Sequence, residues 1–162
     1  MRTETRTDRD RQALDAVEKV IAELNEKATD AEDKKESLFL IVVEGRRDVV
    51  SLRNMGIKPE IEIRMCANKP IAEFCEEIAE TRKEVVVLTD WDRKGGILAS
   101  ALKSQFQNLG VDCDGSYREK LLYHTKKEIK DVESLYTHFL KLKRKVNPDL
   151  YGEEDEKEEF EI

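Results

Sequence analysis

The amino-acid sequence predicts an α/β fold with a mostly parallel, four-stranded sheet flanked by helices. Two observations support this prediction. Segments typical of strands alternate with segments typical of helices, which is the pattern of a parallel sheet with crossover helices. Two of the strand segments, LFLIVV at 38–43 and EVVVL at 84–88, are continuously apolar, as strands buried on both faces are.

The N-terminal part of the chain predicts an added amphipathic helix. Within residues 9–28, apolar side chains recur at helical spacing and form one narrow stripe. The stripe consists of Leu14, Val17, Ile21 and Leu24. We expect this helix to cover the edge of the core, although so narrow a stripe also suits a dimer contact. Residues 1–36 are assigned to this helix and to the polar linker that follows it.

Between the two apolar strands, the pattern predicts helix, strand and helix. A short helix over 49–55 ends at Gly56, because glycine commonly follows the last helical residue. The alternating residues EIEIRM at 60–65 indicate a half-exposed strand. Asn68 and Pro70 then precede a helix, since proline is well tolerated in the first turn.

The second apolar strand is followed by a predicted helix from Ile97 to Leu109, which ends at Gly110. The short stretch VDCDG after it is at most a weak fourth strand. A last helix is predicted from the helical spacing of five apolar residues: Ile129, Val132, Leu135, Tyr136 and Phe139. We therefore divide the chain into a core at 37–117, a basic helical extension at 118–152 and an acidic disordered tail at 153–162.

Composition limits the class of protein. The chain has 162 residues, of which 39% are hydrophobic and 40% charged, so one domain with a modest core and a charged surface is expected. The cysteines, Cys66, Cys75 and Cys113, form no CxxC pair and are expected to be buried apolar residues in a cytoplasmic protein. No segment has the roughly 18 apolar residues of a membrane helix.

The net charge of −7 is unevenly distributed. Residues 153–162 hold seven acids and one lysine, so they carry most of the negative charge. Residues 118–145 hold nine Lys or Arg and four acids and end in KLKRK. Such a run is either a solvated helix face or a patch that contacts phosphates. The candidate contacts in this run are Lys141, Lys143, Arg144 and Lys145.

Acidic residues follow both apolar strands. Glu44 ends the first, and Asp90 and Asp92 follow the second in the stretch TDWDRKGG. The carboxyl ends of neighbouring parallel strands meet at one edge of the sheet, where ligands bind in such folds. Asp48, one helical turn after Glu44, can join them. Carboxylates this close repel one another unless a cation such as Mg²⁺ compensates them, although any one of them alone could be a loop residue or a helix cap.

The pair VVEGRRDVVSL (42–52) and VVLTDWDRKG (86–95) resembles the two signature motifs of the Toprim domain, which occurs in primases, topoisomerases, nucleases and 5S ribosomal RNA maturases. The resemblance covers residues 38 to about 113 and is strongest to small, stand-alone archaeal and bacterial Toprim proteins. It implies a Rossmann-like fold. It also implies that Glu44 acts as general base or acid, often in contact with metal, that Asp90 and Asp92 hold Mg²⁺, and that Asp48 supports the site.

Lys94 stands where several branches of the family carry a third acid, which argues against a full two-metal site. Lys94 and Arg93 can instead add positive charge near a scissile phosphate. The Gly95 and Gly96 amides open a helix whose N-terminus favours anions. Arg46 and Arg47 can contact phosphates or pair with neighbouring acids. Trp91 can stack on a base or pack over the adjacent helix.

These residues predict Mg²⁺-dependent, or Mn²⁺-dependent, phosphodiester chemistry on RNA or DNA. The leading interpretation is a nuclease, with structured RNA among its candidate substrates. The alternative is a noncatalytic, metal-dependent nucleic-acid-binding module of a larger complex, and a homodimer is compatible with both. A dehalogenase-type phosphatase would need Thr or Val at position 94 and a later acidic pair. A receiver domain would need paired acids after the first strand. The sequence has neither pattern.

Overall fold

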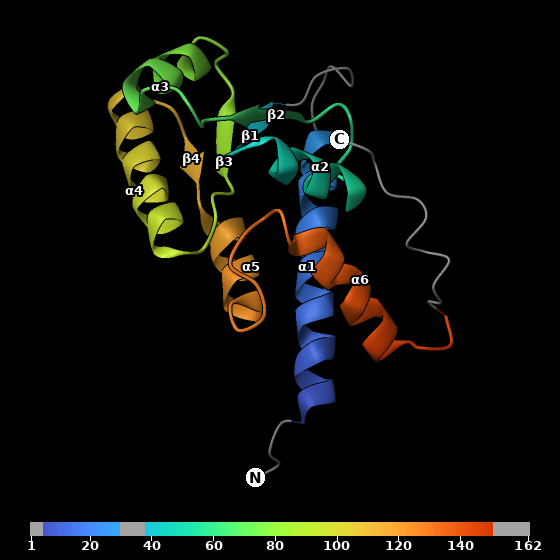
Figure 1. Ribbon diagram of the computed structural model, residues 1–162. Helices are drawn as coiled ribbons and strands as arrows, with labels where there is room; N and C mark the ends of the chain where they lie inside the picture. The colour runs from blue at the N-terminus through green and yellow to red at the C-terminus, as the bar shows by residue number, and fades with distance from the viewer. Residues whose placement is uncertain (1–4, 30–37, 151–162) are drawn as a thin grey trace.

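The computed structural model describes residues 5–29 and 38–150, and these form one parallel sheet of four strands flanked by helices (Figure 1). The strand order is β2-β1-β3-β4, which confirms the predicted α/β class and the parallel sheet. The strands are β1 (Phe39–Val43), β2 (Glu62–Met65), β3 (Glu84–Val87) and the two-residue β4 (Cys113–Asp114). The linker and the tail at 153–162 lie outside the described residues.

Helices cover both faces of the sheet. One face carries α3 (Ile71–Ala79) and α4 (Arg93–Asn108), which pack against each other. The other carries α1 (Arg6–Thr29), α2 (Arg46–Asn54), α5 (Ser116–Thr125) and α6 (Leu135–Val146). None of the helices in the described ranges is long and apolar enough to cross a membrane.

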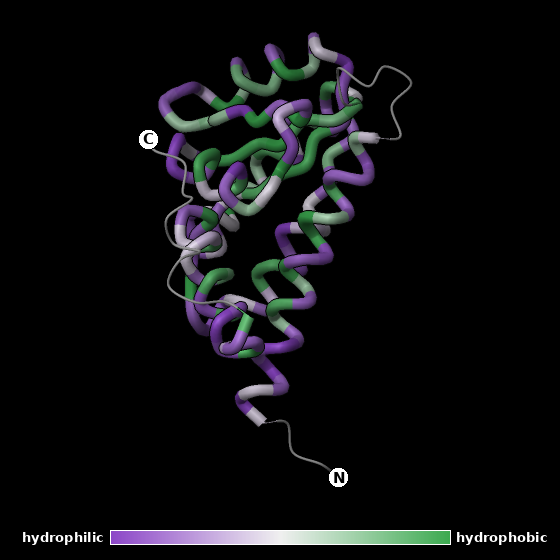
Figure 2. The backbone as a smooth tube through the Cα atoms, turned by 90° about the vertical axis from the view of Figure 1, so that its right-hand side faces the viewer, coloured by the Kyte–Doolittle hydropathy of each residue, from purple (hydrophilic) through white to green (hydrophobic). Residues whose placement is uncertain are grey.

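Strand β1 joins the two halves of the core. Its five residues are fully buried, and successive side chains point to opposite faces of the sheet. Phe39, Ile41 and Val43 pack in the cluster under α1, whereas Leu40 and Val42 pack in the cluster under α3 and α4. This arrangement explains the continuous apolar run in the sequence. Figure 2 shows hydrophobic residues gathered along the central strands and mixed residues along the helices.

Helix α1 packs against other helices of the same chain. Its predicted stripe, including Val17 and Leu24, is buried against α5 and α6. The Lys27 ammonium lies 3.1 Å from both carboxylate oxygens of Glu84 at the start of β3. The Asn25 amide donates to the Gly56 carbonyl at 2.9 Å. Intramolecular packing therefore accounts for the stripe.

Several predicted boundaries were wrong. Helices α2 and α4 begin three and four residues earlier than predicted, since Gly45 and Asp92 occupy their N-cap positions. The predicted last helix is shorter, because α6 begins at Leu135 and leaves Ile129 and Val132 in the connection from α5. Their apolar spacing resembled a helix, but both side chains pack on the core from a loop.

The predicted helix ends at two glycines are confirmed. Gly56 follows the last turn of α2 with a φ of +104°, and Gly110 follows α4 with a φ of +72°. Residues with a side chain rarely adopt a positive φ of this kind, whereas glycine adopts it without steric cost. The cysteine prediction also holds in outline, because Cys66 and Cys75 are buried, Cys113 is half-buried and all three are free thiols.

Replacement of a fully buried α1 side chain is expected to destabilise the whole fold. Leu24→Ala should lower the free energy of unfolding by about 3 kcal/mol, because it leaves a cavity between α1 and the sheet. Chemical denaturation measures this change. Glu18→Ala on the exposed side of α1 should change it by less than about 0.5 kcal/mol. Equal effects of the two variants would contradict the assigned packing of α1.

Candidate functional site

The candidate site lies where β1 and β3 end side by side. The two strands pair in parallel, and the pairing continues past β3 through the Leu88 amide, which donates to the Val42 carbonyl at 2.8 Å. Glu44 directly follows β1, and Asp90 lies two residues after Leu88. A carboxylate oxygen of Glu44 accepts a hydrogen bond from the backbone amide of Asp90 at 2.8 Å. Residues 46 positions apart are thus in direct contact.

Asp48 is the most buried acid of this group, with 6% of its surface exposed. It lies in the first turn of α2 and accepts a hydrogen bond from the Gly45 amide at 3.0 Å, so it helps to cap the helix. Burial raises the pKa of its carboxyl above the ordinary value, and the Glu44 carboxylate also raises it. The Gly45 hydrogen bond acts in the opposite direction. Asp48 therefore helps to cap α2 and also lies close enough to Glu44 to be affected by its charge.

Asp90 is the acid whose ionisation is most perturbed. Its pKa is raised to about 7, chiefly by burial and also by the Asp48 and Glu44 carboxylates. The Val132 amide donates to its Oδ1 at 3.0 Å and lowers the pKa in part. Three carboxylates from two strand ends and one helix therefore act on one another, which is the arrangement that a bound cation would relieve.

The described acids do not form a preformed metal site. Among residues 5–29 and 38–150, no three His, Cys, Asp or Glu side chains are grouped closely enough to hold a metal ion. The chemistry of the donors nevertheless fits Mg²⁺, which prefers carboxylate oxygen and keeps several waters. A cation here would require these carboxylates to move closer together.

Asp92 lies beside this group in the sequence but has a structural task of its own. It is exposed, and its Oδ1 accepts from the Gly95 amide at 2.7 Å as the N-cap of α4. Its Oδ2 makes no hydrogen bond within the described part of the chain. Arg93 and Lys94 are exposed in the first turn of α4, and neither forms an ion pair with a described acid.

Gly95 determines the shape of the turn after β3. The Thr89 hydroxyl donates to its carbonyl at 2.8 Å, and a Cβ added at Gly95 would lie 1.8 Å from the Asp90 carbonyl oxygen. No side chain fits in that space. The Gly95 amide is buried and donates a hydrogen bond to the Asp92 carboxylate. The Gly96 amide donates to the Asp92 backbone carbonyl. Neither amide is therefore open to an anion in this arrangement.

Trp91 holds the connection between α5 and α6 against the site. Its indole N–H donates to the Ile129 carbonyl and its backbone amide to the Lys130 carbonyl, both at 2.9 Å. The ring is half-buried against the core cluster under α1. Together with the bond between Val132 and Asp90, these contacts fix residues 129–132 over the end of β3.

Arg118 is a site residue that sequence reasoning missed. It is 6% exposed, although it was counted only as part of a basic run. Its guanidinium donates to the Thr89 carbonyl at 3.0 Å and to the Asp90 carbonyl at 2.7 Å. Arg118 therefore orients the backbone that carries Asp90. The only sequence signal was its place at the start of the basic run after a weak strand, which does not distinguish a buried arginine from an exposed one.

The remaining predicted contacts lie on α2 and α6. Arg46 is exposed, and Arg47 pairs with Glu133 at 3.1 Å with both side chains largely exposed. The basic run at 141–145 occupies the end of α6 that points away from the sheet (Figure 1). Lys141 and Lys145 are exposed there, Lys143 lies over the Phe139 ring at 4.4 Å, and Arg144 is half-buried.

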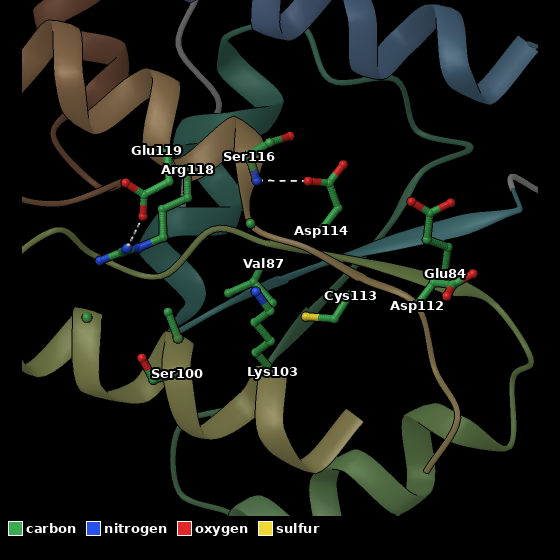
Figure 3. A pocket seen from close by; sticks show the side chains of 13 residues that line it. Glu84, Val87, Ser100, Lys103, Asp112, Cys113, Asp114, Ser116, Arg118 and Glu119 are labelled. Atoms are coloured by element: carbon green, nitrogen blue, oxygen red, sulfur yellow. Dashed lines mark hydrogen bonds and ion pairs between the residues drawn. The ribbon is translucent and has the colours of Figure 1, made fainter. Parts of the chain in front are cut away.

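Another cavity in the described ranges borders this site, because Gly96 and Arg118 line it. It has a volume of about 870 Å³ and lies between α4, β4 and α5 (Figure 3). None of the predicted acids lines it. Its charged groups are already engaged in part, because Arg118 pairs with Glu119 at 3.3 Å and Asp114 accepts from the Ser116 amide at 2.8 Å. The acidic strand ends remain the better candidate site.

The space at Gly95 leads to a test of the turn. Gly95→Ala should lower the free energy of unfolding by about 3 kcal/mol, because its methyl group would overlap the Asp90 carbonyl. Gly96→Ala is the matched control, since its Cβ would meet nothing nearer than Arg118 at 3.8 Å and alanine favours a helix. Thermal unfolding of both variants measures the difference, and equal stabilities would contradict the close approach.

The pKa of Asp90 leads to a test of pH dependence. The pKa of Asp90 is about 7 in the folded protein, above the ordinary value of 3.8, so the folded protein binds this proton more tightly than the unfolded chain does. The resulting contribution to the free energy of unfolding is fully present below about pH 4 and is lost as the pH rises to about 7. In metal-free buffer, Asp90→Asn should therefore become progressively more stable relative to the parent over this range. Asp112→Asn, at an exposed position, should show no such trend. A constant difference for Asp90→Asn would rule out the perturbation.

Comparison with known proteins agrees with this geometry. A family described as Toprim-like matches residues 41–134, the segment that carries all the acids above. The UPF0292 protein of Methanosarcina barkeri is 42% identical over 83% of this chain and 88% of its own length. That of Methanocaldococcus jannaschii is 35% identical over 75% of this chain and 90% of its own length.

A solved structure, described as a putative protein from Aquifex aeolicus, has a similar fold. The TM-score is 0.54 at 21% identity, over 72% of this chain and 94% of that one. This likeness concerns the fold alone, whereas the sequence matches concern the family. The extent of those matches, together with the acids at the ends of β1 and β3, establishes that the chain is a member of the UPF0292 family with a Toprim-like domain.

Proposed function

We propose that the protein carries out Mg²⁺-dependent phosphodiester chemistry on nucleic acid and acts as a nuclease. The observation that carries this proposal is the contact between Glu44 and the Asp90 amide, which brings carboxylates from two strand ends together and helps to raise the pKa of Asp90 to about 7. Groups with perturbed ionisation in such a place are candidates for a functional site.

Glu44, Asp90 and Asp92 are the residues that would hold the ion. Asp92 has an oxygen without a hydrogen bond among the described residues. Glu44 and Asp90 each accept from one backbone amide and also interact with each other through their side chains. The bound ion would neutralise charge on the phosphoryl oxygens of the substrate. Mn²⁺ has similar ligand preferences and could substitute for it.

Side chains around the ion would transfer protons, contact phosphates and hold the acids in position. Glu44 is half-buried at the end of β1 and can take a proton from an attacking water or give one to a leaving oxygen. Asp48 holds the start of α2 and adds negative charge next to Glu44. Lys94 and Arg93 are exposed in the first turn of α4 and can contact substrate phosphates. Arg118 keeps the Asp90 backbone in place from beneath.

A second candidate is a noncatalytic module that binds nucleic acid through the same ion. Two observations favour it. The described carboxylates are not grouped closely enough to ligate a metal without rearrangement. In addition, Lys94 stands where the resemblance to several Toprim branches implies a third acid, so this chain has positive charge at that position. A site of this kind could retain a phosphate without activating water.

A cleavage assay distinguishes these functions. The purified chain is incubated with labelled single-stranded, duplex and structured RNA and DNA in Mg²⁺, in Mn²⁺ and in chelator. We expect cleavage of at least one substrate that requires the ion. Glu44→Gln should reduce the rate at least about 100-fold, because general acid–base catalysis contributes that much. Glu76→Gln, an exposed position on α3, is the matched control and should keep the parental rate.

Cleavage that survives in Glu44→Gln would show that the assigned site is wrong. Ion-dependent retention of nucleic acid without any cleavage would instead support the binding module. The pattern of substrates cut or retained identifies RNA or DNA as the partner.

A further inference from the structure

A second cavity lies on the helical side of the molecule, away from the acids. It has a volume of about 580 Å³ and is enclosed by the N-terminal half of α1, the C-terminal end of α5 and the middle of α6. In Figure 1 these segments lie together below the sheet. Only some residues of the basic run at 118–145 line this cavity. The residues of α1 that line it were not part of any predicted site.

The charges at this cavity are predominantly positive. Arg6 and Arg9 of α1 line it from one side, and Lys126 and Lys127 line it from the other. All four side chains are exposed. The carboxylates that line it are Asp10 and Glu128, so cations outnumber acids by two in a chain whose net charge is −7. Two elements distant in sequence thus supply cations to one concave surface.

A histidine lines the interior of the cavity. His138 is only 8% exposed, and its ring makes no hydrogen bond to any described residue. Its ring nitrogens are not among the fully buried, unpaired polar atoms, so they keep some exposed surface and can meet a ligand or water. Burial lowers the pKa of His138, and Lys145 and Lys141 lower it too, against the effects of Glu128 and Asp10. The cations of α6 therefore also act on the cavity.

An aromatic side chain lies at the rim. Tyr123 lines the cavity with 72% of its surface exposed, and the His124 ring packs edge-on against it at 5.0 Å between centroids. An exposed aromatic face beside cations is suited to a base that follows a phosphate. The same connection that supplies Lys126 and Lys127 goes on to residues 129–132, which contact Trp91 and Asp90.

We propose that this cavity binds a phosphate group, carried by a nucleic-acid strand or by a free nucleotide. The cations at its rim attract the phosphate, His138 offers a hydrogen bond within, and Tyr123 can stack on the attached base. With a nucleic-acid strand as ligand, the inference rests on the proposed function and adds an anchor outside the acidic site. With a free nucleotide as ligand, it is independent of that function.

The chain has two histidines, His124 and His138, and both line this cavity. Histidine ring signals in NMR spectra therefore report on this site alone. In chelator, where the acidic site holds no ion, a short single-stranded RNA or DNA is titrated into the full chain in one arm. AMP and inorganic phosphate are titrated in another. We expect at least the ring signals of His138 to shift and saturate, and the arm that shifts them identifies the source of the phosphate.

Charge variants test whether the cavity is a specific site. Arg9→Gln with Lys127→Gln removes two lining cations, and Arg11→Gln with Lys130→Gln removes two exposed cations from the same two segments outside the cavity. If the strand is the ligand, the first pair should reduce the slope of log affinity against log salt by about 1.4, the value for two contacts to a single strand. If the nucleotide is the ligand, the first pair should weaken its binding. The second pair should change neither.

The proposal is overturned if no ligand shifts the histidine signals or if both pairs weaken binding equally. These outcomes are separate from failure of the nuclease. A chain that cuts nothing in Mg²⁺ but shows saturable histidine shifts in chelator would retain this site and lose the proposed function. Cleavage that depends on Glu44, with no histidine shifts, would have the opposite meaning.

Discussion

The parallel pairing of β1 with β3 is the constraint on which the rest of the molecule depends. It aligns two fully apolar strands at the centre of the sheet, and it brings the residues after them to one edge. Glu44 and Asp90 meet there because the strands are neighbours, although more than forty residues separate them in sequence. A change of strand order would keep every motif and disperse the site.

The acidic cluster is held together by backbone groups. Amides of Gly45, Asp90 and Val132 donate to Asp48, Glu44 and Asp90 respectively, so each carboxylate is oriented by one neutral donor. One such hydrogen bond offsets only part of the burial and repulsion acting on Asp90. The remaining cost of burying Asp90 beside two carboxylates is offset by the packing of the two core clusters. That packing keeps the strand ends in position.

The sequence predicted the features that depend on local pattern. The buried strands, the parallel sheet and the helix ends at Gly56 and Gly110 all follow from apolar runs or backbone preferences within a few residues. Adjacency of Glu44 and Asp90 was also predictable, because both follow uniformly apolar strands.

Features that depend on tertiary contacts were not predictable. Ile129 and Val132 have helical spacing, but the bonds to Trp91 and Asp90 hold their segment as a loop. Arg118 is buried where two carbonyls of the turn after β3 accept from it, and contacts that span 28 and 29 positions of the chain leave no local pattern in the sequence. Asp92 serves as a helix cap as well as a candidate ligand, and an Asp beside glycines is equally compatible with both tasks.

The packing of α1 against α6 bears on how this domain could be combined with others. The segment that matches the Toprim-like family, 41–134, contains neither helix, yet both contribute fully buried side chains to the cluster under the sheet. Without α1 and α6, that segment would leave part of the cluster on this face of the sheet open to water, although α2 and α5 would still cover the rest. In a larger protein that embeds a similar segment, a neighbouring domain would have to supply apolar cover for that face.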